Sequence, residues 1–263
     1  MSHSGNHTAP PAAPPATADA GGGLRHTLEL VRSAVPPLHP GGRGIVAAAA
    51  GGTLLARTLL RRVGLRRAGA AVGRFGLAGT AATALFFREP KRVPPADIGV
   101  VVSAADGLVA LVDQAAPPPE LGLPDTPRPR VSVFLSLLDV HVQRVPVAGV
   151  VTEVAYRAGT FLSADLDKAS ADNERNSVVI APAAGGDPVV VVQIAGLLAR
   201  RIVCDLRAGS QAELGSTYGL IRFGSRVDVY LPVGTTTLVR PGQRMVGGET
   251  VLARLTPASD SGG

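Results

Sequence analysis

The chain has 263 residues, enough for one large or two modest domains, and its net charge of +6 is unevenly distributed. Residues 1–99 contain 12 Lys and Arg against 4 Asp and Glu, whereas residues 100–263 contain 14 against 16. Aromatic residues make up only 3%, which disfavours nucleic acid and favours an anionic membrane surface as the partner of the basic third. The single cysteine, Cys204, excludes a disulfide framework, and His141, the one histidine beyond residue 39, excludes a multi-histidine metal site in the globular part.

A helical region is expected over residues 24–97. Two apolar stretches in it, residues 44–60 and 68–87, are separated by the Arg-rich segment "RRVGLRR" and interrupted by Arg57 and Arg74. Neither stretch therefore supplies the roughly 18–20 uninterrupted apolar residues of a simple spanning helix. We expect two helices that associate with the cytoplasmic face of the cell membrane, as a tight hairpin or lying in its plane. A soluble, alanine-rich helical hairpin is the alternative.

The rest of the chain has a different character. Residues 1–23 and 256–263 are predicted to be disordered tails. Residues 98–255 contain short β-branched runs broken by Gly and Pro, such as "RVSVFLS", "PVVVVQIAG" and "RVDVYLP", which predict a mainly β domain of sandwich or barrel-type hybrid architecture. The segment 194–206 fits either a strand or a short helix. A weak internal repeat links "AADGLVALVD", "PVAGVVTEVAYRAG" and "RPGQRMVGGETVLARL".

Three Gly-Ser bonds occur within seventeen residues, before Ser210, Ser216 and Ser225. The first two lie among small and polar residues and are typical of loops. Ser225 instead lies between two apolar runs, in "LIRFGSRVDVYLP", where a glycine marks a bulge or a strained peptide. Strain at a peptide that precedes a hydroxyl, with a base to take the hydroxyl proton, is what self-cleavage through a serine requires. The sequence therefore singles out Gly224-Ser225.

Two further residues are candidates for chemistry. His141 lies in "FLSLLDVHVQRVPVAG", and an extended strand would place Asp139 on the same side as His141, where it could orient the imidazole. The alternative is a histidine that is hydrogen-bonded within the sheet. Asp106 lies in "AADG", and Asp-Gly by itself indicates a hairpin turn.

Five stretches, in order, connect these residues to a known family: "FFREPKRVPP", "AADGLV", "FLSLLDVHVQRVPVAGVV", "NERNSVV" and "GLIRFGSRVDVYLP". With them the chain resembles the phosphatidylserine decarboxylase proenzymes in their short bacterial and archaeal form, over about residues 40–255. The resemblance implies self-cleavage between Gly224 and Ser225 into a β chain, 1–224, and an α chain, 225–263, that remain associated. Ser225 would become a covalent pyruvoyl group, the cofactor.

The resemblance also implies roles for individual residues. Asp106, His141 and Ser225 match the Asp–His–Ser arrangement of the family, so that Asp106 would be more than a turn residue. Arg144 stands where many relatives have a second histidine, and short-form relatives lack it too. His141 is therefore expected to serve both self-cleavage and the later decarboxylation of phosphatidylserine to phosphatidylethanolamine, in which the pyruvoyl group accepts the electrons released with CO₂. Asn173, in "NERN", is expected to have a structural role near the cleavage loop.

Other functions stay open at this point. The substrate could be a related lipid with a serine headgroup. The chain could also be a membrane-tethered β-sandwich scaffold or carrier that never matures, although Lys168, the one lysine beyond residue 100, lies in a polar run that does not suit a carrier. A homo-oligomer is compatible with the sequence, and no metal is implied.

Overall fold

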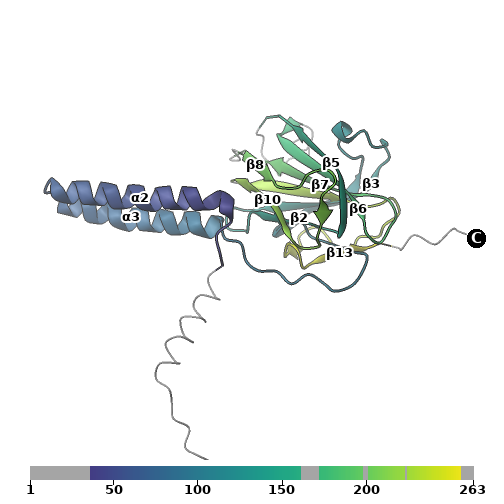
Figure 1. The fold of residues 1–263 in the computed structure, drawn as a ribbon, viewed down its shortest axis with the longest axis horizontal. Coiled ribbons are helices and arrows are strands. Elements are labelled where there is room, and N and C mark those ends of the chain that lie inside the picture. Colours follow the sequence, from purple (N-terminus) through teal and green to yellow (C-terminus); the bar gives the residue numbers. More distant parts are fainter. Residues whose placement is uncertain (1–35, 161–171, 198–200, 223, 256–263) are drawn as a thin grey trace, which may run out of the picture. The chain divides into compact units, whose positions relative to one another are not determined.

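The computed structural model of the chain describes residues 36–160, 172–197, 201–222 and 224–255 (Figure 1). The predicted tails lie outside the described residues. Within the described residues, two α-helices are followed by thirteen strands and one short 3-10 helix, η1 (Pro119–Leu121). The predicted mainly β fold with an N-terminal helical hairpin is thereby confirmed, whereas the predicted domain boundaries remain predictions.

The hairpin consists of α2 (Pro40–Arg62) and α3 (Arg66–Phe86) (Figure 1). Pro40 begins α2 at a position where the missing N–H costs nothing, and His39 caps it by accepting a hydrogen bond from the Gly41 N–H at 3.1 Å. Glycines of α3 let the helices approach closely, because a Cβ at Gly76 would collide with Thr53 of α2. Among the described residues, no helix combines the length and apolarity needed to cross a membrane.

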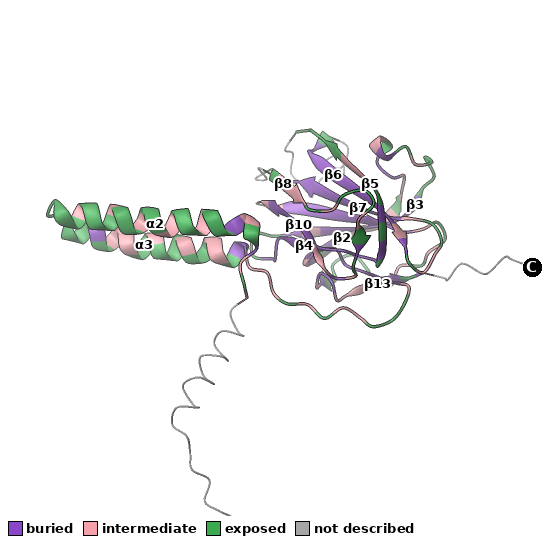
Figure 2. Ribbon diagram, in the orientation of Figure 1, coloured by how far each residue is buried: buried purple, intermediate pink, exposed green. Residues whose placement is uncertain are grey.

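Large apolar side chains are exposed along both helices, as Figure 2 shows by their mostly green and pink ribbons. Apart from Gly69 near the closed end, the buried residues of the two helices lie at the base of the hairpin. There Phe86 and Phe87 pack with Leu220 of the β region in a small apolar cluster. The rest of the hairpin thus presents an apolar surface that the β strands do not cover. The exposed apolar residues of the hairpin are Leu54, Leu55, Leu59, Val63, Leu65, Phe75, Leu77 and Leu85.

The strands form three antiparallel sheets. The largest has, in spatial order, β12 (Arg244–Met245), β2 (Gly107–Ala115), β3 (Arg128–Leu135), β11 (Ser225–Tyr230), β7 (Val189–Ala195), β6 (Arg175–Pro182), β5 (Gly149–Arg157) and β9 (Gln211–Ala212). A second contains β4 (Val142–Arg144), β10 (Thr217–Arg222) and β8 (Arg201–Cys204). The third pairs β1 (Val100–Val102) with β13 (Val251–Arg254). The segment 194–206 is therefore part of two strands, β7 and β8.

The large sheet is built from two similar halves. Its second and seventh strands, β2 and β5, each begin with a glycine whose Cβ would collide with a neighbouring carbonyl, that of Phe134 for Gly107 and of Ala181 for Gly149. Each then shifts register after its third residue and pairs with a buried eight-residue strand, β3 or β6. The first two members of the repeat seen in the sequence are these equivalent strands. The two halves meet where β11 pairs with β7.

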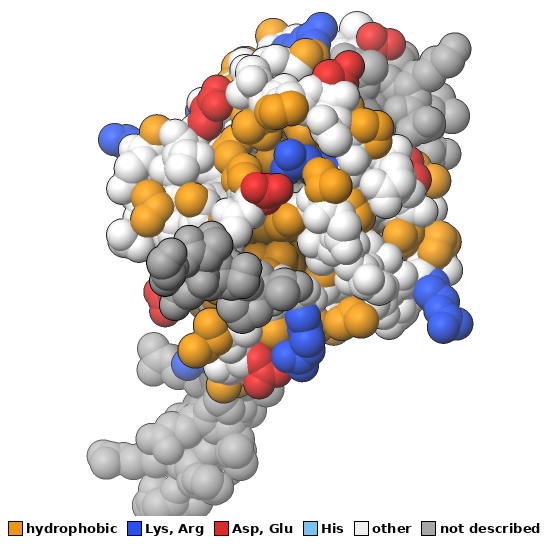
Figure 3. Space-filling model, turned by 90° about the vertical axis from the view of Figure 1, so that its right-hand side faces the viewer, with side chains coloured by type: hydrophobic (Ala, Val, Ile, Leu, Met, Phe, Trp, Pro, Cys, Tyr) orange, Lys and Arg blue, Asp and Glu red, His pale blue; other side chains and the backbone are white. Residues whose placement is uncertain are grey.

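Alternation along β11 separates two environments. Val227 and Val229 enter the main apolar core. Arg226 and Asp228 face the other side, where Arg226 donates two hydrogen bonds to the fully buried Asp228 carboxylate at 2.7 and 2.8 Å. A cavity of about 660 Å³ is lined by Tyr230 and other residues from this region. Figure 3 shows a hollow on one face of the molecule in which acidic and basic side chains are surrounded by hydrophobic ones.

Candidate active site

Ser225 begins the central strand of the large sheet and is fully buried. It is paired with Leu135 of β3 on one side and with Ala195 of β7 on the other. Its hydroxyl oxygen has no hydrogen-bond partner within the part of the chain that the structure describes. A buried hydroxyl without a partner costs on the order of 1–3 kcal/mol, so its presence in a folded protein calls for an explanation, of which a role in chemistry is one.

The other two candidate serines are placed differently. Ser210 Oγ donates a hydrogen bond to the Arg207 carbonyl, and Ser216 Oγ donates one to the Glu213 carbonyl, both at 2.7 Å. Each closes a local turn on the surface, as their sequence context predicts. Of the three serines, only Ser225 has a hydroxyl that is buried and uncommitted among the described residues.

Gly224 holds the peptide in front of Ser225 in a conformation that favours glycine. Its φ is +68°, in the left-handed region that L-residues with a side chain adopt only at a cost. A Cβ at this position would meet nothing within 4 Å, so the need for glycine here is conformational. Phe223, the residue before it, lies outside the described residues.

His141 is fully buried and directed at this peptide. Its Nδ1 lies 3.0 Å from the Asp139 carbonyl oxygen, and its Nε2 accepts a hydrogen bond from the Gly224 N–H at 3.4 Å. A carbonyl can only accept and an amide N–H can only donate, so the proton resides on Nδ1 and the lone pair on Nε2. The lone pair of the imidazole therefore faces the Gly224-Ser225 segment.

The surroundings of His141 keep it neutral. Burial lowers the pKa of the imidazole to about 4, and the nearby Arg88 guanidinium acts in the same direction. One wall of the site is the ring of Phe86, the last residue of α3. At pH 7 the imidazole is consequently in the form that can accept a proton.

The prediction that the Asp139 side chain lies on the same side of an extended strand as His141 and orients the imidazole was wrong. Residues 136–141 bend instead of continuing as a strand, so that Asp139 turns its carboxylate away from the imidazole. That carboxylate accepts hydrogen bonds from the Ser136 N–H and hydroxyl, and forms an ion pair with Arg244. Asp139 instead orients His141 through its backbone carbonyl.

Asp106 lies directly before β2, and its carboxylate accepts hydrogen bonds from Arg92, at 2.6 Å, and from the Gly247 N–H, at 2.7 Å. Within the described part of the chain, no hydrogen bond joins it to His141. Burial raises the pKa of its carboxyl, and the Arg92 guanidinium opposes that shift. A role for Asp106 in self-cleavage stays a prediction. Arg144, at the position of the second family histidine, donates to the Pro90 carbonyl at 2.7 Å and so holds the segment before β1.

Comparison with known proteins identifies the family. A family model described as phosphatidylserine decarboxylase matches residues 80–253. The chain is 58% identical to the phosphatidylserine decarboxylase proenzyme of Nocardia farcinica over 94% of this chain and 98% of that protein. It is 58% identical to the corresponding proenzyme of Rhodococcus erythropolis, over 94% and 97%, and 56% identical to that of Mycobacteroides abscessus, over 92% and 97%. The chain belongs to the phosphatidylserine decarboxylase family. The resemblance found in the sequence is confirmed.

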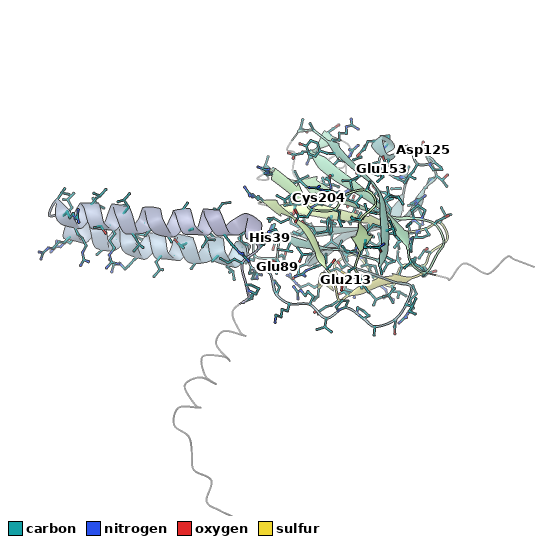
Figure 4. The ribbon with its side chains drawn as sticks, in the orientation of Figure 1. His39, Glu89, Asp125, Glu153, Cys204 and Glu213 are labelled. Atoms are coloured by element: carbon teal, nitrogen blue, oxygen red, sulfur yellow. The ribbon has the colours of Figure 1, made fainter. Side chains whose placement is uncertain are left out.

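The decarboxylase-family site includes two residues that sequence reasoning gave no part in the chemistry. The Gly196 N–H donates to the Gly224 carbonyl oxygen at 3.1 Å, and Asn173 Nδ2 donates to the Ala195 carbonyl at 2.7 Å. The motif "NERN" was the available signal, but only strand pairing places it beside residue 225. Cys204, by contrast, lies on β8 (Figure 4), and burial raises the pKa of its thiol, which disfavours a reactive thiolate.

The junction of hairpin and β strands lies close to this site. Figure 4 shows His39 and Glu89 at that junction, one before α2 and one after α3. The His39 N–H donates to the Phe87 carbonyl at 2.9 Å, and Glu89 accepts a hydrogen bond from the Thr217 hydroxyl at 2.6 Å. The first contact joins the two ends of the hairpin, and the second ties its base to β10, the strand that leads to Gly224.

Proposed function

We propose that this chain is a proenzyme that cleaves itself between Gly224 and Ser225 and then decarboxylates phosphatidylserine to phosphatidylethanolamine. One observation carries the proposal: a buried, uncommitted serine hydroxyl follows a left-handed glycine whose N–H is bound by the lone pair of a neutral histidine. Membership of the decarboxylase family, whose relatives are named proenzymes, supports it.

Self-cleavage would begin with attack by Ser225 Oγ on the Gly224 carbonyl carbon. His141 Nε2 takes the hydroxyl proton and returns it to the Ser225 nitrogen as the C–N bond breaks, which leaves an ester between the two residues. Loss of the Ser225 Cα proton then breaks the bond between Cβ and Oγ and expels the Gly224 carboxylate, which leaves a dehydroalanine. Water then adds at the Cα of residue 225, and the nitrogen leaves as ammonia. The products are a chain ending at Gly224 and a chain that begins with a pyruvoyl group.

The residues present fit such a group. The ketone carbon would be the Ser225 Cα, which the sheet pairing of Ser225 on both sides holds in place. The Ser225 oxygen, which has no hydrogen-bond partner among the described residues, is free to leave with Gly224. When formed, the group supplies an electron sink for the electrons released with CO₂. His141 would then hold or return a proton from Nε2, in the tautomer that the Asp139 carbonyl maintains.

We further propose that the hairpin places the site at the cytoplasmic face of the cell membrane. Residues 30–88 contain no Asp or Glu, so the arginines at the closed end of the hairpin have no acidic neighbours in the helices. Arg57, Arg61, Arg62 and Arg66 line a cavity of about 530 Å³ there. Exposed apolar side chains lie along the same helices, which is the combination that binds anionic lipid surfaces.

The deciding experiment is an intact-mass spectrum of the purified protein beside its Ser225→Ala variant. We expect a C-terminal piece of 39 residues, residues 225–263, with a blocked N-terminus and a mass that fits a pyruvoyl group, absent in the variant. A 48-residue piece would place the cleavage before Ser216 instead. A single uncut chain that is folded and bound to vesicles would favour the scaffold function.

Headgroup specificity is then tested on the mature protein. The mature protein should release CO₂ from vesicles that contain phosphatidylserine and convert this lipid to phosphatidylethanolamine. The Ser225→Ala variant should produce neither product. Conversion of another serine-headgroup lipid, with phosphatidylserine left unchanged, would reassign the substrate and leave the self-cleavage proposal standing.

A further inference from the structure

The carbonyl of the bond proposed to be cleaved accepts a hydrogen bond from a peptide group that is itself hydrogen-bonded to a buried side chain. The Gly224 carbonyl oxygen accepts from the Gly196 N–H at 3.1 Å. That N–H belongs to the same peptide unit as the Ala195 carbonyl, which accepts from Asn173 Nδ2 at 2.7 Å. The side-chain amide, the Ala195–Gly196 peptide and the Gly224 carbonyl thus form one continuous hydrogen-bonded chain.

We propose that Asn173 is a positioning residue for self-cleavage: it holds and polarises the Ala195–Gly196 peptide, whose N–H stabilises the negative charge that develops on the Gly224 oxygen. The inference rests on the proposed cleavage between Gly224 and Ser225. It extends the role predicted for "NERN", because it assigns Asn173 an effect on the reacting carbonyl as well as on the fold.

The surroundings fix this peptide from both sides. The Ala195 N–H donates to the Glu174 carbonyl at 2.9 Å, so the residue cannot rotate freely at the end of β7. Asn173 is itself buried, and because the Ala195 carbonyl can only accept, the contact at 2.7 Å requires the amide nitrogen Nδ2, and not Oδ1, to face it. A preorganised donor of this kind needs no rearrangement when the charge appears.

Two physical effects act on the reacting carbonyl. A peptide whose carbonyl accepts a hydrogen bond becomes a stronger donor at its N–H, because the two bonds polarise each other, more so in a dry site. When Ser225 Oγ bonds to the Gly224 carbon, the carbonyl π electrons move to the oxygen that Gly196 faces. The charge is relieved when the C–N bond breaks and the Ser225 nitrogen takes the proton from His141.

The first test is the Asn173→Ala variant, followed by intact mass over time from freshly refolded or newly synthesised protein. Removal of one direct oxyanion donor typically costs about 10²–10³ in rate. Asn173 acts through Gly196, so we expect the appearance of the 39-residue piece to slow by roughly tenfold or more. Once matured, each cleaved molecule should decarboxylate within about threefold of the parent, since the Gly224 carbonyl is no longer reacting.

The Ser225→Ala background separates folding from cleavage. Asn173→Ala combined with Ser225→Ala should fold, with the circular dichroism spectrum of Ser225→Ala alone and a modestly lower melting temperature. A double variant that fails to fold would assign Asn173 to folding and overturn the proposal.

A second variant, Asn173→Asp, gives a pH signature that a purely structural role would not produce. The introduced carboxyl can donate to the Ala195 carbonyl only when protonated, and its charge would oppose the developing oxyanion. We expect slower cleavage than in Asn173→Ala at pH 7, with the rate rising as the pH falls to about 5, where the buried His141 is still neutral. A rate that is flat or falls over this range would contradict the proposal.

Asn176→Ala is the matched control, because Asn176 is a buried amide of the same motif that donates to Gln193 Oε1 at 3.2 Å. It should cleave within about threefold of the parent. Equal slowing in both variants, or cleavage of Asn173→Ala at the parental rate, would overturn the inference while leaving self-cleavage established. A parent protein that never cleaves would instead remove the proposed function.

Discussion

The ring of Phe86 lies over the imidazole of His141, with the ring centroids 4.0 Å apart and the planes inclined by 32°. Phe86 is the last residue of α3, so the helical hairpin ends on the candidate base. The dry surroundings that lower the pKa of His141 are therefore built partly by the helices and partly by the β strands. A substitution at the base of the hairpin should therefore change the pKa of His141.

Phe86→Ala should raise the pKa of His141 from about 4 toward its ordinary value near 6.5, because water reaches the imidazole. It should also lower the free energy of unfolding by about 3–5 kcal/mol through loss of core packing. Phe86→Leu keeps the wall apolar and should change both much less. Imidazole NMR titration in the Ser225→Ala background measures the pKa, and an unshifted value in Phe86→Ala would show that the ring does not exclude water.

Stability should decline below pH 6.5 because of His141. Its folded pKa is lowered, so between pH 6.5 and 4 the unfolded chain binds the proton and the folded chain does not. The contribution is fully present above pH 6.5 and is lost progressively down to pH 4, by up to about 3 kcal/mol. Urea unfolding of Ser225→Ala, with and without His141→Gln, isolates this part, because carboxyl groups such as Asp106 contribute equally to both. Parallel pH profiles for the two proteins would refute the assignment.

Gly224→Ala should act through backbone conformation alone. The side chain has open space, but a φ of +68° costs alanine about 1–2 kcal/mol. We expect that loss of stability together with slower self-cleavage, because the peptide relaxes out of the reactive conformation. Gly234→Ala is a matched control, with a φ of +79° and equally open space, but it lies beyond the opposite end of β11 from the bond proposed to be cleaved. It should lose similar stability and cleave normally, and equal cleavage rates in both variants would argue against strain at Gly224.

Membrane binding should depend on where the positive charges lie. Replacing Arg61, Arg62 and Arg66 of the hairpin by Gln should weaken binding to vesicles rich in anionic lipid by roughly a hundredfold, because three charges at roughly 1 kcal/mol each amount to about 3 kcal/mol. The same replacement at three exposed arginines of the β region should have little effect on sedimentation with the vesicles. If both triple variants bind equally, net charge and not the hairpin determines association. The control set is Arg201, Arg207 and Arg240.

Much of the fold was predictable because its signals are local. The Ala- and Leu-rich stretches interrupted by "RRVGLRR" predicted the hairpin, and the β-branched runs predicted the strands. The buried position of Ser225 and the turn at Ser216 could also be predicted, because the first lies between apolar runs and the second among turn residues. Local composition was enough for these predictions, since each concerns a segment of fewer than twenty-five residues.

The remaining features depend on pairing between distant segments. No local pattern shows that β11 lies between β3 and β7, and without that order Asn173 cannot be placed beside the Gly224 carbonyl. Asp139 was misplaced for a different reason. Leu137 and Leu138 continue an apolar run that is typical of a strand, but both are exposed in a turn, which reverses the direction of the Asp139 side chain.

The position of β11 at the junction of the two halves of the large sheet has a consequence for the lifetime of the active protein. Cleavage at residue 225 would make this central strand the beginning of a separate 39-residue peptide, hydrogen-bonded along both edges to the larger piece. Its departure would split the sheet, so the prosthetic group could leave only by unfolding. Unlike an enzyme that exchanges a dissociable cofactor, each molecule would form its prosthetic group only once. Chemical damage to the group could then be repaired only by synthesis of a new chain.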